Sequence, residues 1–297
     1  MSTAQIFDRG YRPYDGPRLG VRGSINSLTR HSIQRALGLK RTFWNKILPF
    51  LAIFLAYVPA IVFVGIAAFL KSRLSRSGVD IDRILPTYGE YYSFIWAAIV
   101  VFAAFVAPEL LCSDRRTGML GLYLASPLRR DSYLVAKASA VGFVLLLVSL
   151  GPPLFMLVAR TIAGSGPADF VAFLGILWRI VVSGVVVAAL PAALSLALAS
   201  TTTRRAAASA AFVLIEIGSV AVTQSLILAG NSATLFVADL AYLPLELVVR
   251  IYGEPPGQTL TTASTVPTAT LAIAYVVITA VLAWFVWFRY RRIQVTR

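Results

Sequence analysis

The segment SDRRTGMLGLYLASPLRRDSYLVAK, residues 113–137, separates two of the most apolar stretches of the chain. Residues 92–111 precede it and residues 134–158 follow it, and a helix needs about 20 mainly apolar residues to cross a bilayer. The segment itself carries five basic side chains, which are Arg115, Arg116, Arg129, Arg130 and Lys137. Short basic segments next to apolar runs are typical of the cytoplasmic loops of membrane proteins.

The composition of the whole chain also predicts a membrane protein. The 297 residues are 58% hydrophobic and only 13% charged, whereas soluble domains are about 45–50% apolar and about 25% charged. Because backbone polar groups in lipid must be satisfied within the segment, we expect an all-α integral membrane fold. A single cysteine, Cys112, and a single histidine, His31, exclude an intrachain disulfide and a Cys/His zinc cluster.

The hydropathy pattern predicts six transmembrane helices, at about residues 44–70, 92–111, 134–158, 180–199, 206–229 and 269–288. Residues 44–288 therefore form the transmembrane domain, with a loop at 113–133 and a cytoplasmic tail at 289–297. Five prolines inside or near the spans are expected to kink or end their helices, namely Pro59, Pro108, Pro152, Pro153 and Pro191. The outer connection at 230–268 is predicted to hold two short helices that meet near Pro244.

Residues 1–43 form a basic tail that includes an amphipathic stretch at 24–41. A basic amphipathic helix before a span is typical of the membrane interface, and a simple solvated tail is the alternative. Lys and Arg concentrate in this tail, in the 113–133 loop, at Arg204–Arg205 and after residue 288, which predicts that both termini are cytoplasmic. Because these residues lie at helix ends and form no single face, a nucleic-acid partner is not expected.

The 113–133 loop has its own helical pattern. Thr117 is expected to cap a short helix, which Ser126 and Pro127 end. Asp131 or Ser132 is expected to cap the third span. Four apolar side chains fall on one helical stripe, Met119, Leu120, Tyr123 and Leu124. Such a stripe needs a partner, which is either the lipid interface or another protein.

With Glu109, these residues resemble the signature of type-2 ABC transporter permeases. The matching positions are Glu109, Asp114, Arg115, Arg116, Gly118, Leu120, Leu122, Pro127, Leu128, Arg129, Arg130, Tyr133, Leu134 and Lys137. The resemblance implies six spans, an N-terminal interfacial helix, a cytoplasmic coupling helix and short outer helices before the last span. It also implies a multi-pass subunit of a bacterial exporter in the plasma membrane. Many family members carry an acidic residue where this chain has Met119 and Leu120.

The resemblance further implies the partners of the chain. These are a cytoplasmic ABC ATPase subunit, a second permease copy or a homologue, and the lipid bilayer. ATP and Mg²⁺ are expected on the ATPase, because the chain has no G-x-x-x-x-G-K-[ST] loop of its own, and no cofactor, metal or catalytic site is expected here. The implied ATPase-coupling residues are Asp114, Arg115, Arg116, Gly118, Met119, Leu120, Tyr123, Leu124, Pro127, Arg129 and Arg130.

Three ionisable residues in or near the spans carry functional hypotheses. Glu216 is either an anchor for a cationic substrate, a proton or sodium, or a carboxyl that fixes helix packing. The resemblance makes Glu109 a gate or coupling element paired with a basic side chain, and a simple helix-end carboxylate is the alternative. Arg179 is expected to extend to the outer surface, too far from Glu216 for direct contact.

Two other function classes remain open. An ion channel or a secondary carrier without an ATPase also fits six spans, although it leaves the Met119 to Leu124 stripe without a purpose. A membrane-embedded lipid-modifying enzyme needs clustered acids and histidines at one membrane face. Its only candidates are the outer carboxylates Asp239, Glu246 and Glu254, which have no His or Cys partner.

Overall fold

The computed structural model describes residues 20–39, 44–74, 86–124, 128–164, 166–256 and 263–292. Its elements are α1 (Gly20–Ala36), α2 (Trp44–Leu74), α3 (Tyr88–Arg116), α4 (Met119–Leu124), α5 (Arg130–Ile162), α6 (Phe170–Thr201), α7 (Arg205–Leu228), the 3₁₀ helix η2 (Ala233–Ala238), α8 (Tyr242–Ile251) and α9 (Thr268–Arg292). Within these ranges there is no strand. Six helices, α2, α3, α5, α6, α7 and α9, are long and apolar enough to cross a membrane. The general expectation of an all-α, multi-pass membrane fold is therefore confirmed.

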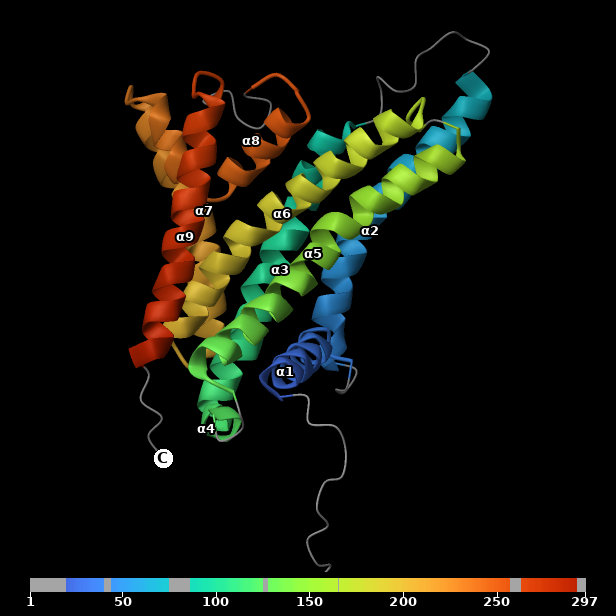
Figure 1. Ribbon diagram of the computed structural model, residues 1–297. Helices are drawn as coiled ribbons and strands as arrows, with labels where there is room; N and C mark the ends of the chain where they lie inside the picture. Colours follow the sequence, from blue (N-terminus) through green and yellow to red (C-terminus); the bar gives the residue numbers. More distant parts are fainter. Residues whose placement is uncertain are drawn as a thin grey trace, which may run out of the picture.

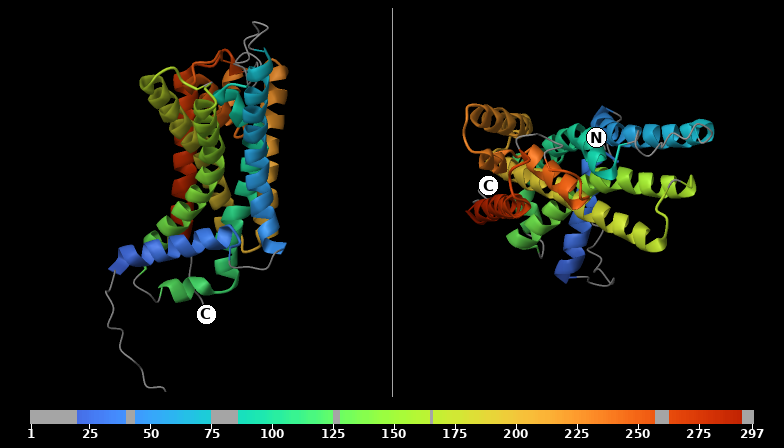
Figure 2. Two further views of the ribbon diagram at one scale, coloured as in Figure 1. Left: turned by 90° about the vertical axis from the view of Figure 1, so that its right-hand side faces the viewer. Right: turned by 90° about the horizontal axis from the view of Figure 1, so that it is seen from above.

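The two ends of the helix bundle differ in what they carry. At one end lie α1, α4 and the last turn of α9, and α1 runs across the bundle beneath the long helices (Figures 1 and 2). We refer to this end of the bundle as the α4 end. The opposite end carries η2 and α8, and we refer to it as the α8 end (Figure 1). Within the described part of the 113–133 loop, the structure has one short helix, α4, over Met119–Leu124.

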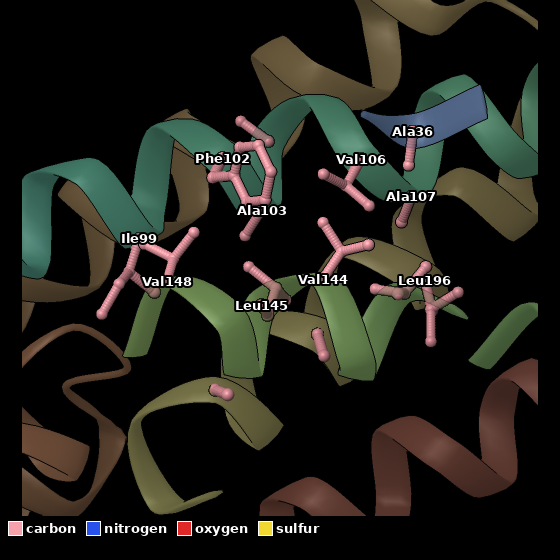
Figure 3. Close-up of a cluster of buried hydrophobic side chains, with 14 of the residues drawn as sticks. Ala36, Ile99, Phe102, Ala103, Val106, Ala107, Val144, Leu145, Val148 and Leu196 are labelled. Atoms are coloured by element: carbon pink, nitrogen blue, oxygen red, sulfur yellow. The ribbon is translucent and has the colours of Figure 1, made fainter. Parts of the chain in front are cut away.

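The centre of the bundle is built by α3, α5 and α6. Aliphatic and aromatic side chains of α3 face those of α5, with Leu196 of α6 beside them (Figure 3). Ile99, Phe102, Val144, Leu145 and Val148 are fully buried. In contrast, α2, α7 and α9 leave many large apolar side chains exposed, which suits helices that face lipid. Since lipid chains are as apolar as these side chains, close van der Waals packing has to hold the centre together.

Two glycines let neighbouring helices approach closely. A Cβ atom at Gly151 of α5 would lie 2.0 Å from the Tyr57 hydroxyl of α2, and one at Gly184 of α6 would lie 2.0 Å from Leu150 Cδ2. The hydroxyl of Ser149 donates to the Gly184 carbonyl at 2.9 Å across the same contact. Small residues at helix crossings are a common device of membrane bundles.

Local expectations about helix ends are wrong at several points. All five prolines lie inside continuous helices, so none of them ends a helix, and a kink at each of them stays a prediction. The residue before α5 is Arg129, and neither Asp131 nor Ser132 caps it. Thr117 closes α3 and does not open α4, because its hydroxyl donates to the Ser113 carbonyl at 2.9 Å.

The connection at residues 230–268 also breaks at a different place from the one expected. Pro244 lies inside the first turn of α8. N–H groups in the first turn have no carbonyl partner within the helix, so proline, which lacks an N–H, is tolerated there. The break occurs at Asp239, whose carboxylate accepts the Tyr242 N–H at 2.9 Å and so starts α8. Ser126 and Pro127, which were expected to end the short helix, lie outside the described residues.

Candidate functional site

A buried carboxylate, Asp114, lies in the last turn of α3 at the α4 end. Its two oxygens contact two cations from other helices: Arg35 of α1 at 2.7 Å and Lys137 of α5 at 2.7 Å. The Tyr133 hydroxyl donates to the same carboxylate at 3.0 Å. A charge removed from water is tolerated only when it is paired and hydrogen-bonded, and Asp114 meets both conditions.

Glu109, one and a half turns earlier on α3, extends this network to α7. Arg35 Nε lies 3.6 Å from Glu109 Oε1, and the Arg205 guanidinium donates to Glu109 Oε2. Arg35 therefore bridges both acids of α3. We call Arg35, Glu109, Asp114, Lys137 and Arg205 the ionic cluster, and it joins α1, α3, α5 and α7 at one point.

Aromatic side chains connect α4 to the ionic cluster. The Tyr123 ring of α4 lies 5.9 Å from the Tyr133 ring, which in turn lies 5.9 Å from the Tyr290 ring of α9. Lys137 Nζ lies 5.7 Å from the centre of the Tyr123 ring, within the range of a cation–π contact. Burial raises the pKa of the Tyr123 hydroxyl, and the nearby Asp114 charge adds to the effect.

The apolar stripe expected on α4 is therefore partly covered by the bundle itself. Leu120 is buried and Tyr123 packs against the core, so both side chains are covered by the protein itself. The exposed apolar side chain of α4 is Leu122, with 65% of its surface accessible. Met119 is half-buried, while the side chain of Leu124 and the whole of Pro127 lie outside what the structure describes.

The arginines around α4 divide into two groups. Arg115 donates to the carbonyls of Ser200 at 2.7 Å and Thr202 at 3.2 Å, and Arg130 donates to the Arg291 carbonyl at 2.6 Å. Both thus satisfy carbonyls at the C-terminal ends of neighbouring helices, where positive charge is favoured. Arg116 and Arg129 are exposed, and Gly118 between α3 and α4 adopts the left-handed conformation with φ of 70°.

A cavity of about 630 Å³ opens beside the ionic cluster, between α1, α2, α3 and the start of α7. Its apolar wall is formed by Pro49, Phe102, Phe105, Val106 and Pro108. Four arginines line it as well, Arg35, Arg116, Arg204 and Arg205. Glu109 is the one acidic residue among the lining side chains.

Glu216 lies in a separate polar patch on α7. Only 2% of its surface is accessible, and within the described residues neither carboxylate oxygen has a hydrogen-bond partner. The same helix supplies Thr223 and Gln224, which donate to Asp239 at 3.3 and 3.4 Å. Burial raises the pKa of Asp239, although these hydrogen bonds lower it in part.

Arg179, Glu246 and Arg250 have hydrogen-bond or ion-pair partners at the α8 end. Arg179 is exposed and donates to the Tyr252 carbonyl at 3.4 Å, with no contact to Glu216 among the described residues. Glu246 pairs with Arg250 at 3.1 Å, and Arg250 also donates to the carbonyls of Val266 and Ala263. No group of three or more His, Cys, Asp or Glu side chains in the described part of the chain could hold a metal ion.

Sequence reasoning named both acids of the ionic cluster but left the cations Arg35, Lys137 and Arg205 out of the candidate site. Lys137 carried a usable signal, because a lysine three residues into an apolar run needs a buried counter-charge. Arg35 carried none, since nothing in a basic amphipathic stretch shows which arginine turns inward. No family model matches the chain, and a search of curated proteins finds no similar sequence.

Proposed function

We propose that this chain is the membrane subunit of an ATP-driven exporter and that a separate ABC ATPase docks at its α4 end. The proposal starts from the resemblance of residues 109–137 to type-2 ABC permeases. The observation that carries it is the ionic cluster, which links α1 to α3, α5 and α7, together with the Tyr123 ring of α4, whose centre lies 5.7 Å from Lys137 Nζ. A force applied to α4 or α1 would therefore reach three spanning helices through direct side-chain contacts.

In this proposal the ATPase contacts the exposed surface of α4, with Leu122 as the apolar anchor and Arg129 beside it. ATP binding closes two ATPase subunits, and their movement displaces α4 and α1 against the spans. The pathway lies between two permease copies, or this chain and a homologue, and switches from inward to outward access. Such switching is a rigid-body rotation about a packed interface. The α4 end is cytoplasmic, α1 is the interfacial helix and η2 and α8 are the short outer helices.

The docking surface is tested with Leu122→Glu. This side chain is exposed, so its replacement leaves the bundle intact while placing a charge in the ATPase contact. We expect the variant to lower the amount of co-purifying Walker-A ATPase about tenfold or more, and cargo-stimulated ATP hydrolysis with it. The matched control is Ile162→Glu, an 82% exposed apolar residue at the other end of the bundle. Equal ATPase recovery with both variants would refute docking on α4.

A secondary carrier is the second candidate function, and Glu216 is the observation that favours it. A carboxyl buried in a spanning helix without a hydrogen-bond partner in the described part of the chain is a typical proton or cation site. The distinguishing experiment places the purified chain alone in liposomes. Transport driven by a proton or sodium gradient, and lost in Glu216→Gln, supports the carrier. Transport that requires the ATPase and ATP supports the exporter and leaves Glu216 as a packing residue.

A further inference from the structure

The cavity beside the ionic cluster combines an apolar wall with a basic side. Its apolar wall comes from α2 and α3, and its basic side comes from α1, the end of α3 and the start of α7. A volume of about 630 Å³ lies within the range of small-molecule sites, which is roughly 300–1,000 Å³.

The four arginines of the cavity are not equivalent. Arg35 and Arg205 are held by Asp114 and Glu109 within the ionic cluster. Arg116 and Arg204 are exposed, and no carboxylate in the described ranges pairs with either guanidinium. Two cations are thus available to a ligand, and arginine binds phosphate and carboxylate groups through paired hydrogen bonds.

The start of α7 adds to the positive character of the same side. Arg204 precedes the first residue of α7, and no side chain caps this helix start. Arg205, Ala206 and Ser209 of the first turns all line the cavity. The free N–H groups and the positive end of the helix dipole favour an anion there.

The apolar wall continues out of the cavity along α3. Phe105 lines the cavity and is 42% exposed, and Val101, one helical turn further toward the middle of the bundle, is 40% exposed. Together they form an open apolar track that begins beside the arginines. A free phosphate or carboxylate ion would have no use for this track, whereas a chain of methylene groups would bury it.

We propose that this cavity binds an anionic amphiphile. Its phosphate or carboxylate head pairs with Arg116 and Arg204 at the start of α7, and its apolar chain lies along Phe105 and Val101. Binding itself does not depend on the ATPase. That the amphiphile is cargo, and not a resident membrane lipid, rests on the proposed exporter function.

The binding test uses native mass spectrometry of the purified full-length chain in a nonionic detergent, without any ATPase. The probes are didecanoyl phosphatidylglycerol, didecanoyl phosphatidylcholine and glycerol 3-phosphate. We expect phosphatidylglycerol to bind about tenfold more tightly than phosphatidylcholine, and glycerol 3-phosphate to compete with neither. Equal affinity for the two lipids would overturn the proposal. Full competition by glycerol 3-phosphate would overturn it too, because the site would then bind a bare anion.

Paired arginine variants separate the cavity from general surface charge. The double variant Arg116→Gln/Arg204→Gln should lose the preference for phosphatidylglycerol. Its control, Arg22→Gln/Arg30→Gln, removes the same charge from exposed positions of α1 outside the cavity and should keep the preference. An equal loss in both variants would contradict a specific site.

A second pair of variants tests the apolar track. Phe105→Ala should weaken phosphatidylglycerol binding several-fold, whereas Phe54→Ala, at a 65% exposed position of α2, should not. An unchanged affinity in Phe105→Ala would remove the track from the proposal. In the complex with the ATPase, phosphatidylglycerol that stimulates ATP hydrolysis is cargo. Phosphatidylglycerol that binds without stimulation is a resident lipid.

Discussion

Asp114 is the residue on which the α4 end depends. Its side chain is fully buried and forms an ion pair with Lys137, whose side chain is 1% exposed. No other carboxylate in the described residues forms an ion pair with Lys137. Removing one partner of a buried pair leaves the other charge without compensation, which costs more than the pair contributes. The stability of the α4 end therefore depends on the ion pair between Asp114 and Lys137, and not on how many charged side chains lie there.

We expect Asp114→Asn to lower the free energy of unfolding by about 3–5 kcal/mol, since Lys137 would remain buried without a carboxylate. Thermal unfolding of the purified chain in detergent measures this loss. The double variant Asp114→Asn/Lys137→Met should recover most of it, because the fully buried cation is then gone and Arg35 keeps Glu109 as a partner. Asp169→Asn is the matched control, as asparagine caps a helix as well as aspartate does. A single variant as stable as the control would show that the cluster adds no stability.

Asp239 makes the stability of the chain depend on pH. Burial raises its pKa in the folded state, so the folded chain holds the proton at pH values where the unfolded chain has released it. The contribution of Asp239 is largest below its ordinary pKa of about 3.9 and declines as the pH rises toward the folded-state value. We expect Asp239→Asn to show a smaller fall in melting temperature than the parent chain between pH 4 and pH 7. Parallel pH profiles would contradict this assignment.

At the scale of elements, the contact of α5 with α2 depends on the absence of a side chain at Gly151. We expect Gly151→Ala to destabilise the bundle by about 1–3 kcal/mol, because the Tyr57 hydroxyl lies where the new methyl group must go and the side chain has to move out of the α2–α5 contact. Gly142→Ala on the same helix is the control. Nothing lies within 4 Å of a Cβ there, so the higher helix propensity of alanine should leave stability unchanged or raised. Equal melting temperatures for the two variants would refute this account of the α2–α5 contact.

The existence of the spanning helices could be predicted from sequence, but their ends could not. A bilayer admits no unpaired backbone, so an apolar run of sufficient length has one solution. Helix ends depend on individual hydrogen bonds, which the sequence does not reveal. Asp131 was expected to cap α5, but Arg129 precedes the helix, and Pro244 was expected to separate two helices, but it lies inside α8. Asp239 starts α8 because its carboxylate accepts the Tyr242 N–H, a contact that spacing alone does not reveal.

The candidate site was predictable to the extent that its residues lie close together in sequence. Glu109, Asp114 and the α4 stripe belong to one continuous segment and were found together. Arg35 lies 79 positions from Asp114 and Arg205 lies 96 positions from Glu109, and only the packing of α1 and α7 against α3 brings these pairs together. The polar patch around Glu216 was missed for the same reason, because Asp239 reaches Thr223 across a turn of the chain.

At the scale of the whole molecule, basic groups gather at the α4 end of the bundle. The chain carries a formal net charge of +14, and the ionic cluster, the arginine-lined cavity and the basic last turn of α9 all lie at the α4 end. Positive charge accumulates on the cytoplasmic side of membrane proteins. The proposed coupling requires this orientation, because an ATPase supplied with cytoplasmic ATP can reach only an α4 that faces the cytoplasm.

Cysteine labelling in intact cells tests this orientation directly. Cys112 is buried and is replaced by serine, and a single cysteine is then introduced at the exposed Leu122 or, for comparison, at Ile162 of the α8 end. We expect a membrane-impermeant maleimide to label Leu122→Cys only after the membrane is opened, and Ile162→Cys without opening it. Labelling of Leu122→Cys from outside intact cells would place α4 on the wrong face and contradict ATPase coupling through this helix.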